Sequence, residues 1–246
     1  MNSVADGAPR APELNILAVC GAGTVNVRST AAINLAVAFA AAGRRVELRD
    51  LDPAARAFQA LAAGGDPGGP PVELPISRPL AGRVSVAAGL PAANAAGTEP
   101  APELLLLDCL PRADEVTERA LALAQIVVVP VDASPAAFRA LAEVAALLAA
   151  QRSGDGPRLR VALARVLPRP VDRWGVVEEI TEHYPGALYV STVPLGRRPS
   201  APTGEPSNDP PSRVSHAPTL YAPTTRAAAA YSALALEIGD DLGWRV

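Results

Sequence analysis

The chain has 246 residues, of which 49% are apolar, 19% charged and 4% aromatic, a composition that excludes a wholly disordered protein and suits one large α/β domain or two small ones. The formal net charge of −3 argues against a protein that binds nucleic acid over its whole surface, but it permits a local arginine patch. All 22 basic residues are arginine, so no mechanism that needs a lysine ammonium can run on this chain alone.

The two cysteines, Cys20 and Cys109, are too few for a disulfide framework, so we expect a protein of the reducing cytoplasm. Residues 1–13 are polar and contain proline, and they show no basic segment followed by an apolar stretch. We therefore expect a loose tail without a signal peptide, followed by a single domain over 14–246. The acidic end of the chain, GDDLGWRV, argues against a membrane anchor.

The domain opens with an apolar run at 14–20, which predicts a buried strand, and a turn rich in Gly, Ser and Thr follows at 21–30. Residues 31–42 predict a helix that ends at Gly43. The remaining predicted elements are strands at 45–49, 84–87, 104–108, 126–132, 159–166 and 187–194, and helices at about 54–63, 113–124, 134–151, 172–183 and 226–242.

Strands that alternate with helices, and that are apolar along most of their length, are typical of parallel sheets covered on both faces. The sequence therefore predicts an α/β fold with a doubly wound, mostly parallel sheet. In such sheets ligands bind beyond the carboxyl ends of the strands. The segments that fall at this edge are Gly21–Thr30, Asp50–Asp52, Asp108 and Asp132.

The segment ILAVCGAGTVNVRSTAAINLA, residues 16–36, resembles the start of the ParA/MinD-type partition ATPases, P-loop NTPases that carry KGGVGKTT followed by NLA. Without a gap, Ser29-Thr30 match the two threonines and Asn34-Leu35-Ala36 match the NLA. RVELRDLDP resembles the family's RVLLIDLDP, and LLLLDCLP resembles its IIDCPP. The resemblance extends over about residues 14–240 and implies the fold of that family.

The resemblance also implies a function in partitioning DNA or positioning another large intracellular cargo. Members of the family alternate between a monomer and a dimer that sandwiches nucleotide, and an adaptor protein stimulates their ATPase activity. For this chain it implies association with itself or with a ParA-like paralogue, an adaptor, and a cytoplasmic location that can include the nucleoid. The implied site residues are Gly21, Gly23, Arg28, Ser29 and Thr30 for ATP, Ser29 and Asp108 for Mg²⁺, and Asp52 to orient the attacking water.

This chain departs from the family at the phosphate loop. Thr24, Val25 and Val27 replace glycines, and β-branched valine resists the positive φ that such a loop often requires. The loop lysine is replaced by Arg28, whose planar fork is bulkier than an ammonium. The family's extra signature lysine falls on Gly23, so that charge is absent.

Two interpretations of this degenerate Walker A motif stay open. In one, a distorted loop still binds nucleotide, and the protein is a slow but genuine Mg-ATP-dependent ATPase that uses Arg28, Ser29, Asp52 and Asp108. In the other, the loop is a vestige that only caps the helix starting near Thr30, and hydrolysis is weak or absent. The sequence favours the vestige, which predicts a pseudoenzyme that acts through dimerisation and protein contacts.

A third interpretation, a Rossmann dinucleotide-binding oxidoreductase, has little support. Gly21-Ala22-Gly23 follows a strand and precedes a helix, as in a dinucleotide-binding fingerprint. However, Asn26 stands where the third glycine would be, and no later segment resembles a hydride-transfer site.

Two further groups of residues carry hypotheses. Cys20 and Cys109 end strands that are neighbours in the resembled sheet, so their thiols could approach disulfide distance; the alternative is a pair of buried thiols.

In related proteins, basic residues late in the chain contact nonspecific DNA. The alternative for this chain is a mixed, solvated surface, because acids are interleaved with the arginines. The candidate DNA-binding residues are Arg158, Arg160, Arg197 and Arg198.

Overall fold

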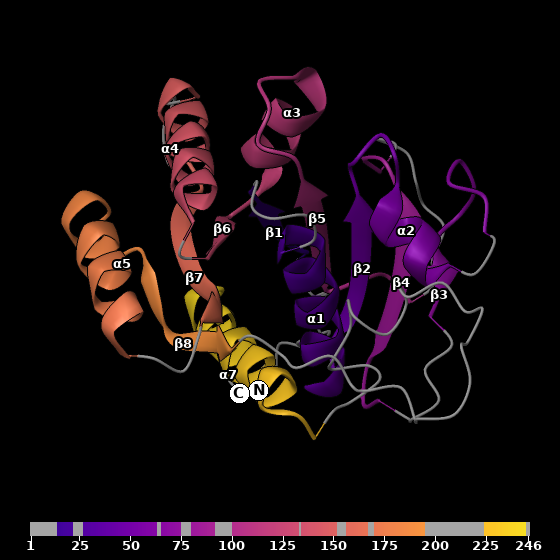
Figure 1. Cartoon of the computed structure of the whole chain (residues 1–246). Coiled ribbons are helices and arrows are strands. Elements are labelled where there is room, and N and C mark those ends of the chain that lie inside the picture. Colours follow the sequence, from indigo (N-terminus) through magenta and orange to yellow (C-terminus); the bar gives the residue numbers. More distant parts are fainter. Residues whose placement is uncertain are drawn as a thin grey trace, which may run out of the picture.

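An eight-stranded sheet forms the centre of the computed structural model (Figure 1), which describes residues 14–21, 27–62, 65–74, 80–91, 100–132, 134–151, 156–166, 170–194 and 224–244. Its strand order is β3-β4-β2-β5-β1-β6-β7-β8, and all neighbours are parallel except β3 and β4. The strands are β1 (Asn15–Cys20), β2 (Arg45–Asp50), β3 (Val72–Glu73), β4 (Arg83–Ala88), β5 (Leu104–Cys109), β6 (Ile126–Val131), β7 (Arg158–Val166) and β8 (Leu188–Pro194).

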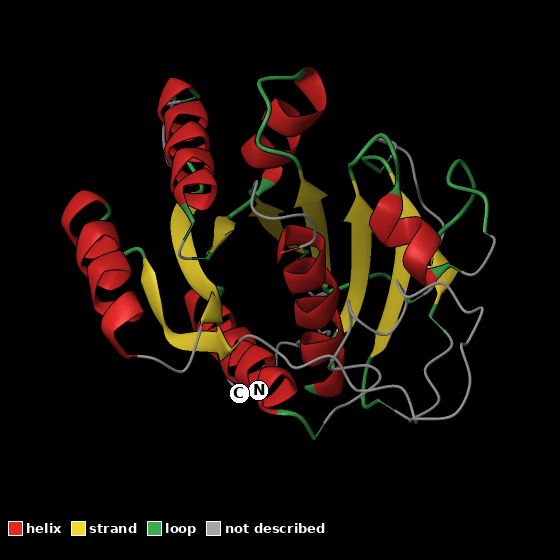
Figure 2. Ribbon diagram, viewed as in Figure 1, coloured by secondary structure: helices red, strands yellow, loops and turns green. Residues whose placement is uncertain are grey.

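Helices cover both faces of this sheet, as Figure 2 shows. Helices α1, α2 and α7 pack on one face, and α3, α4 and α5 pack on the other. Among the described helices, none is long and apolar enough to cross a membrane. Their bounds are α1 (Val27–Ala41), α2 (Arg56–Leu61), α3 (Glu115–Leu123), α4 (Pro135–Ala150), α5 (Pro170–His183) and α7 (Arg226–Asp241).

This architecture confirms the predicted doubly wound, mostly parallel sheet. The sequence analysis missed β3, because a strand of two residues is too short to show any alternation of apolar side chains. It was also wrong about the start of α1, which begins at Val27 rather than at residue 31. The first turn of α1 therefore includes Arg28 and Ser29, which were expected in a loop.

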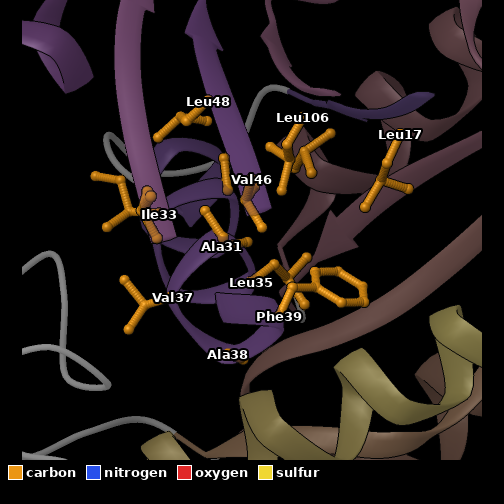
Figure 3. Close-up of a cluster of buried hydrophobic side chains, with 14 of the residues drawn as sticks. Leu17, Ala31, Ile33, Leu35, Val37, Ala38, Phe39, Val46, Leu48 and Leu106 are labelled. Atoms are coloured by element: carbon orange, nitrogen blue, oxygen red, sulfur yellow. The ribbon is translucent and has the colours of Figure 1, made fainter. Parts of the chain in front are cut away.

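Helix α1 is held on nearly all sides by apolar contacts. Its side chains Leu35 and Phe39 lie with Leu17, Val46 and Leu106 from three neighbouring strands (Figure 3), and all five are at most 2% exposed. Helix α7 packs beside α1 on the same face of the sheet. Because close packing leaves little room for sliding, the position of the α1 N-terminus relative to the strand ends is fixed.

A polar cluster at the amino ends of β7 and β8 anchors the end of α7. The carboxylate of Asp241 accepts hydrogen bonds from Arg160 Nε at 2.7 Å, Arg160 Nη2 at 2.9 Å and the Tyr189 hydroxyl at 2.8 Å. These bonds, led by those from Arg160, lower the pKa of Asp241. The carboxylate therefore stabilises the fold only where it is ionised.

We predict that Asp241→Asn lowers the free energy of unfolding by about 1–2 kcal/mol near neutral pH, because it removes charge-assisted hydrogen bonds. Since the folded-state pKa is depressed, this stabilisation is present above the ordinary carboxyl pKa and is lost as pH falls through the folded-state value. Urea unfolding across that pH range measures the difference. The exposed neighbour Asp240 is the matched control, and Asp240→Asn is expected to change stability by no more than about 0.5 kcal/mol. An equal effect of both variants would contradict this assignment.

Candidate functional site

Three carboxylates meet where β2 and β5 end. Asp50 and Asp108 are register partners on neighbouring strands, and Asp52 follows two residues after Asp50. Asp50 and Asp108 are 0% exposed and Asp52 is 8% exposed. Buried like charges on neighbouring strands repel one another, so a cation beside them favours their ionised form.

Arg28 supplies this cation from the first turn of α1. Its Nε donates a hydrogen bond of 2.5 Å to Asp108 Oδ1, and its Nη2 lies 3.7 Å from Asp52 Oδ2. Nη2 also donates to the Ser29 hydroxyl at 3.2 Å. The Arg28 side chain is only 10% exposed. Arg28 therefore acts as a counter-ion to the carboxylates.

Burial and the Arg28 charge act in opposite directions on the pKa of Asp108. Burial raises the pKa of Asp108 to about 6, while the Arg28 guanidinium acts in the opposite direction and the Asp50 charge raises it again. Within the described residues, the second oxygen of Asp108, Oδ2, is buried and accepts no hydrogen bond of good geometry, although the Ser29 hydroxyl lies near enough to Asp108 to lower its pKa. Among the described residues, three carboxyl groups thus lie near one guanidinium.

Asp50 shapes the turn that presents Asp52. Its Oδ1 accepts from the Asp52 backbone N–H and its Oδ2 from the Phe58 N–H, both at 3.0 Å. Burial raises the pKa of Asp50 and these backbone bonds lower it. The turn contains Ala55 at φ 45°, a left-handed conformation that is costly for a residue with a Cβ. The two bonds to Asp50 help to hold that conformation, and with it the place of Asp52.

The remaining residues predicted for nucleotide binding are placed only in part. Gly21 follows β1, and Ser29 and Thr30 lie in the first turn of α1, where the Thr30 carbonyl accepts from the Asn34 side chain at 2.7 Å. Gly23 and the rest of the loop at 22–26 lie outside the described residues. The predicted distortion of that loop therefore stays a prediction.

The predicted DNA-binding arginines are not brought to this site. Arg158 and Arg160 begin β7, at the opposite edge of the sheet, and both form ion pairs with Asp241. Arg197 and Arg198 lie outside the described residues. Asp241 partly neutralises the first two arginines, and binding of nonspecific DNA through these residues stays a prediction.

Cys20 and Cys109 are register partners on β1 and β5, as the expected neighbourhood of their strands implies. Both thiols are free and buried. Burial raises the pKa of Cys20 to about 12 and raises that of Cys109 well above its ordinary value. The pair is thus adjacent but poorly nucleophilic, because the thiolate is the reactive form.

The sequence analysis did not predict the pairing of Arg28 with Asp108 and Asp52. A signal for it exists in the charges: the carboxyl edge of the predicted sheet gathers several acids, and Arg28 is the one basic residue in the adjoining turn at 21–30. The side chain of Asp132 at the same edge accepts a hydrogen bond from Ser134, which caps α4. Asp132 therefore helps to position the N-terminal cap of α4, which is a structural role for one of these acids.

The chain is 32% identical over 238 residues to the chromosome-partitioning ATPase Soj of Thermus thermophilus, a match that covers 86% of this chain and 90% of Soj. No model of a known protein family matches it. Among solved structures, a chain of the MinC:MinD cell division protein complex of Aquifex aeolicus superposes with a TM-score of 0.64 at 17% identity, covering 95% of this chain and 97% of that one. Cobyrinic acid a,c-diamide synthase of Mycobacterium smegmatis, with bound ADP and magnesium, gives 0.61 at 18% identity, covering 94% and 96%. At such identities the two structural matches show a common fold alone.

We predict that Arg28→Met lowers the free energy of unfolding by about 3–5 kcal/mol near neutral pH, because it leaves buried carboxylates without their cation. The loss should shrink toward about pH 5. A raised folded-state pKa means that the folded chain binds the proton of Asp108 more tightly than the unfolded chain, so this group gains stability as pH falls. Asp108→Asn is the matched comparison and should cost less, since Arg28 keeps Asp52. Denaturant unfolding of wild type and both variants near neutral pH and at about pH 5 measures these differences. A loss of unfolding free energy in Arg28→Met that is the same at both pH values would contradict the assignment.

We predict that neither cysteine of the native protein reacts with iodoacetamide at mildly alkaline pH on the time scale that alkylates a free peptide thiol. Both should react once the chain is unfolded in denaturant, because burial in the folded chain is the main cause of their high pKa values. Mass spectrometry of the alkylated chain measures this. Rapid labelling of Cys20 in the folded protein, or a Cys20–Cys109 disulfide in freshly prepared material, would be the contrary result.

Proposed function

Because the chain belongs to the ParA/MinD family of partition ATPases, we propose that it positions DNA or another large intracellular cargo through protein contacts and without a working ATP cycle. The family membership carries the first half of this proposal, since Soj is a chromosome-partitioning ATPase. The ion pairs of Arg28 carry the second half. They engage the one cation at the family's phosphate-binding position with the chain's own carboxylates.

The argument against ATP is one of charge. A triphosphate is strongly anionic, and the described site already has more carboxylates than cations. For Arg28 to turn to a phosphate, it would have to leave Asp108, which is wholly buried, without its partner. Breaking a buried ion pair in this way is strongly destabilising. The absence of lysine, which the family uses to bind phosphate, also supports a site that does not take Mg-ATP.

The second candidate, a slow Mg-ATP-dependent ATPase, is favoured by one observation. The Oδ2 atom of Asp108 is buried without a hydrogen-bond partner among the described residues, and a metal-bound water would satisfy it. Ser29 also retains the hydroxyl that the family uses for Mg²⁺. This candidate requires Arg28 to change its contacts when nucleotide arrives.

Association must then come from protein surfaces rather than from a shared nucleotide. We infer a dimer, with a second copy or a ParA-like paralogue, and an adaptor that links it to cargo. A paralogue with an intact phosphate loop would place the ATP cycle in the partner. The oligomeric state of this chain alone should then be the same with and without Mg-ATP.

We predict no saturable binding of Mg-ATP in a titration with a fluorescent ATP analogue up to millimolar concentration, and no phosphate release above that of a buffer blank. The variants Ser29→Ala and Arg28→Ala are the controls, because a residual signal that both leave unchanged does not come from this site. Saturable binding that disappears in both variants, with hydrolysis that Asp52→Asn abolishes, would establish the slow ATPase instead.

A further inference from the structure

The face of the sheet on which α3, α4 and α5 pack is apolar over β5, β1 and β6 but polar over β2 and β4. Val46 and Leu48 of β2 belong to the core around α1. Because side chains alternate along a strand, Arg45, Glu47 and Arg49 lie on the opposite face, where Arg49 and Glu47 form an ion pair of 2.6 Å. The described core beneath α3, α4 and α5 includes no residue of β2 or β4. Since parallel sheets are normally apolar on both faces, this part of the sheet is suited to polar contacts.

A cavity of about 160 Å³ lies beside these polar side chains, at the amino ends of β2 and β4. Its described walls include Arg45 of β2, Arg83 and Ser85 of β4, and Pro100 and Pro102, which precede β5. A cavity of about 150 Å³ can hold a benzene ring. The space is thus large enough for a small group with a polar end toward the strands and an apolar body toward the prolines.

The two arginines of this cavity are register partners on neighbouring strands, so like charges lie side by side. Arg45 is held in place, since its Nε donates to the Ala101 carbonyl at 2.8 Å and its Nη1 lies 3.4 Å from Glu103. Among the described residues, the Arg83 guanidinium reaches only Glu73, at 4.0 Å, and these two side chains are 62% and 65% exposed. Such an exposed pair contributes little to stability, so Arg83 can exchange it for another carboxylate at small cost.

We propose that this cavity binds a carboxylate. The guanidiniums of Arg45 and Arg83 bind its oxygens, because the planar fork of arginine matches a carboxylate, and the Ser85 hydroxyl donates a further hydrogen bond. Glu73 favours a ligand with a single negative charge over a phosphate dianion, because a second charge would be repelled by its carboxylate. The carboxylate belongs to a free organic acid or to an acidic side chain of a partner protein. No residue of the Arg28 site takes part, so this inference does not depend on the proposed function.

The test titrates the full chain with benzoate, which carries one carboxylate on a ring that the cavity can hold. We expect calorimetry to show saturable binding with a dissociation constant of about 1 mM or below, and no binding of uncharged benzamide. The second probe is an end-capped peptide with a single glutamate. If it displaces benzoate, the ligand is an acidic side chain of a partner; if it does not, the ligand is a free acid. Both results support the carboxylate site.

Three variants separate the cavity from a general attraction to arginine. Arg83→Gln should weaken benzoate binding at least about tenfold, and it should keep the wild-type unfolding temperature because the side chain is exposed. Glu73→Gln removes the competing carboxylate and should tighten binding at least about twofold. Arg112→Gln is the matched control: its side chain is 52% exposed and pairs with Asp114 at 3.5 Å near the carboxyl end of β5, and its loss should leave the affinity unchanged.

Three results would overturn the proposal. They are the absence of saturable benzoate binding to wild-type protein, equal binding of benzoate and benzamide, and an equal loss of affinity in Arg83→Gln and Arg112→Gln. The proposed function is judged separately, by nucleotide binding to wild-type protein, so either can fail while the other stands.

Discussion

The ion pair between Arg28 and Asp108 is the contact on which the described site depends. A parallel sheet brings the ends of β2 and β5 together, so Asp50 and Asp108 must lie side by side away from water. Their charges cannot be screened there by solvent, and one cation has to come from a neighbouring element. The first turn of α1 is the element that reaches them, because apolar packing along the rest of the helix sets its position.

The two clusters at opposite edges of the sheet show how burial changes the same chemistry. Asp241 and Arg160 form a bidentate pair that solvent reaches, with side chains 19% and 23% exposed. Water can hydrate the remaining charge when such a pair is broken, so removing one partner lowers the free energy of unfolding only moderately. Arg28 and Asp108 lie in a site that is nearly closed, where the partner left behind remains a buried charge.

Most of the fold could be predicted from the sequence because it depends on local patterns. Apolar runs mark strands such as β5 and β6, and a serine or threonine caps α4 and α7. The site was less predictable because its contacts join residues far apart in the chain. Arg28 and Asp108 are separated by 80 residues, and the direction of the arginine depends on where the strands place the acid. The same contact joins the first turn of α1, which begins at Val27, to β5.

The contacts of Arg28 affect how the acids at the strand ends, Asp50, Asp52 and Asp108, are interpreted. Beside a phosphate loop, acids at the positions of Asp52 and Asp108 suggest hydrolysis, because they resemble the family's catalytic and metal-binding residues. In this chain they also neutralise Arg28, and the dependence is mutual: a buried guanidinium needs carboxylates as much as they need it. Asp50 likewise has a structural use, since it holds the turn that contains Ala55. These acids therefore have a structural use besides any catalytic one, and their presence alone does not indicate hydrolysis.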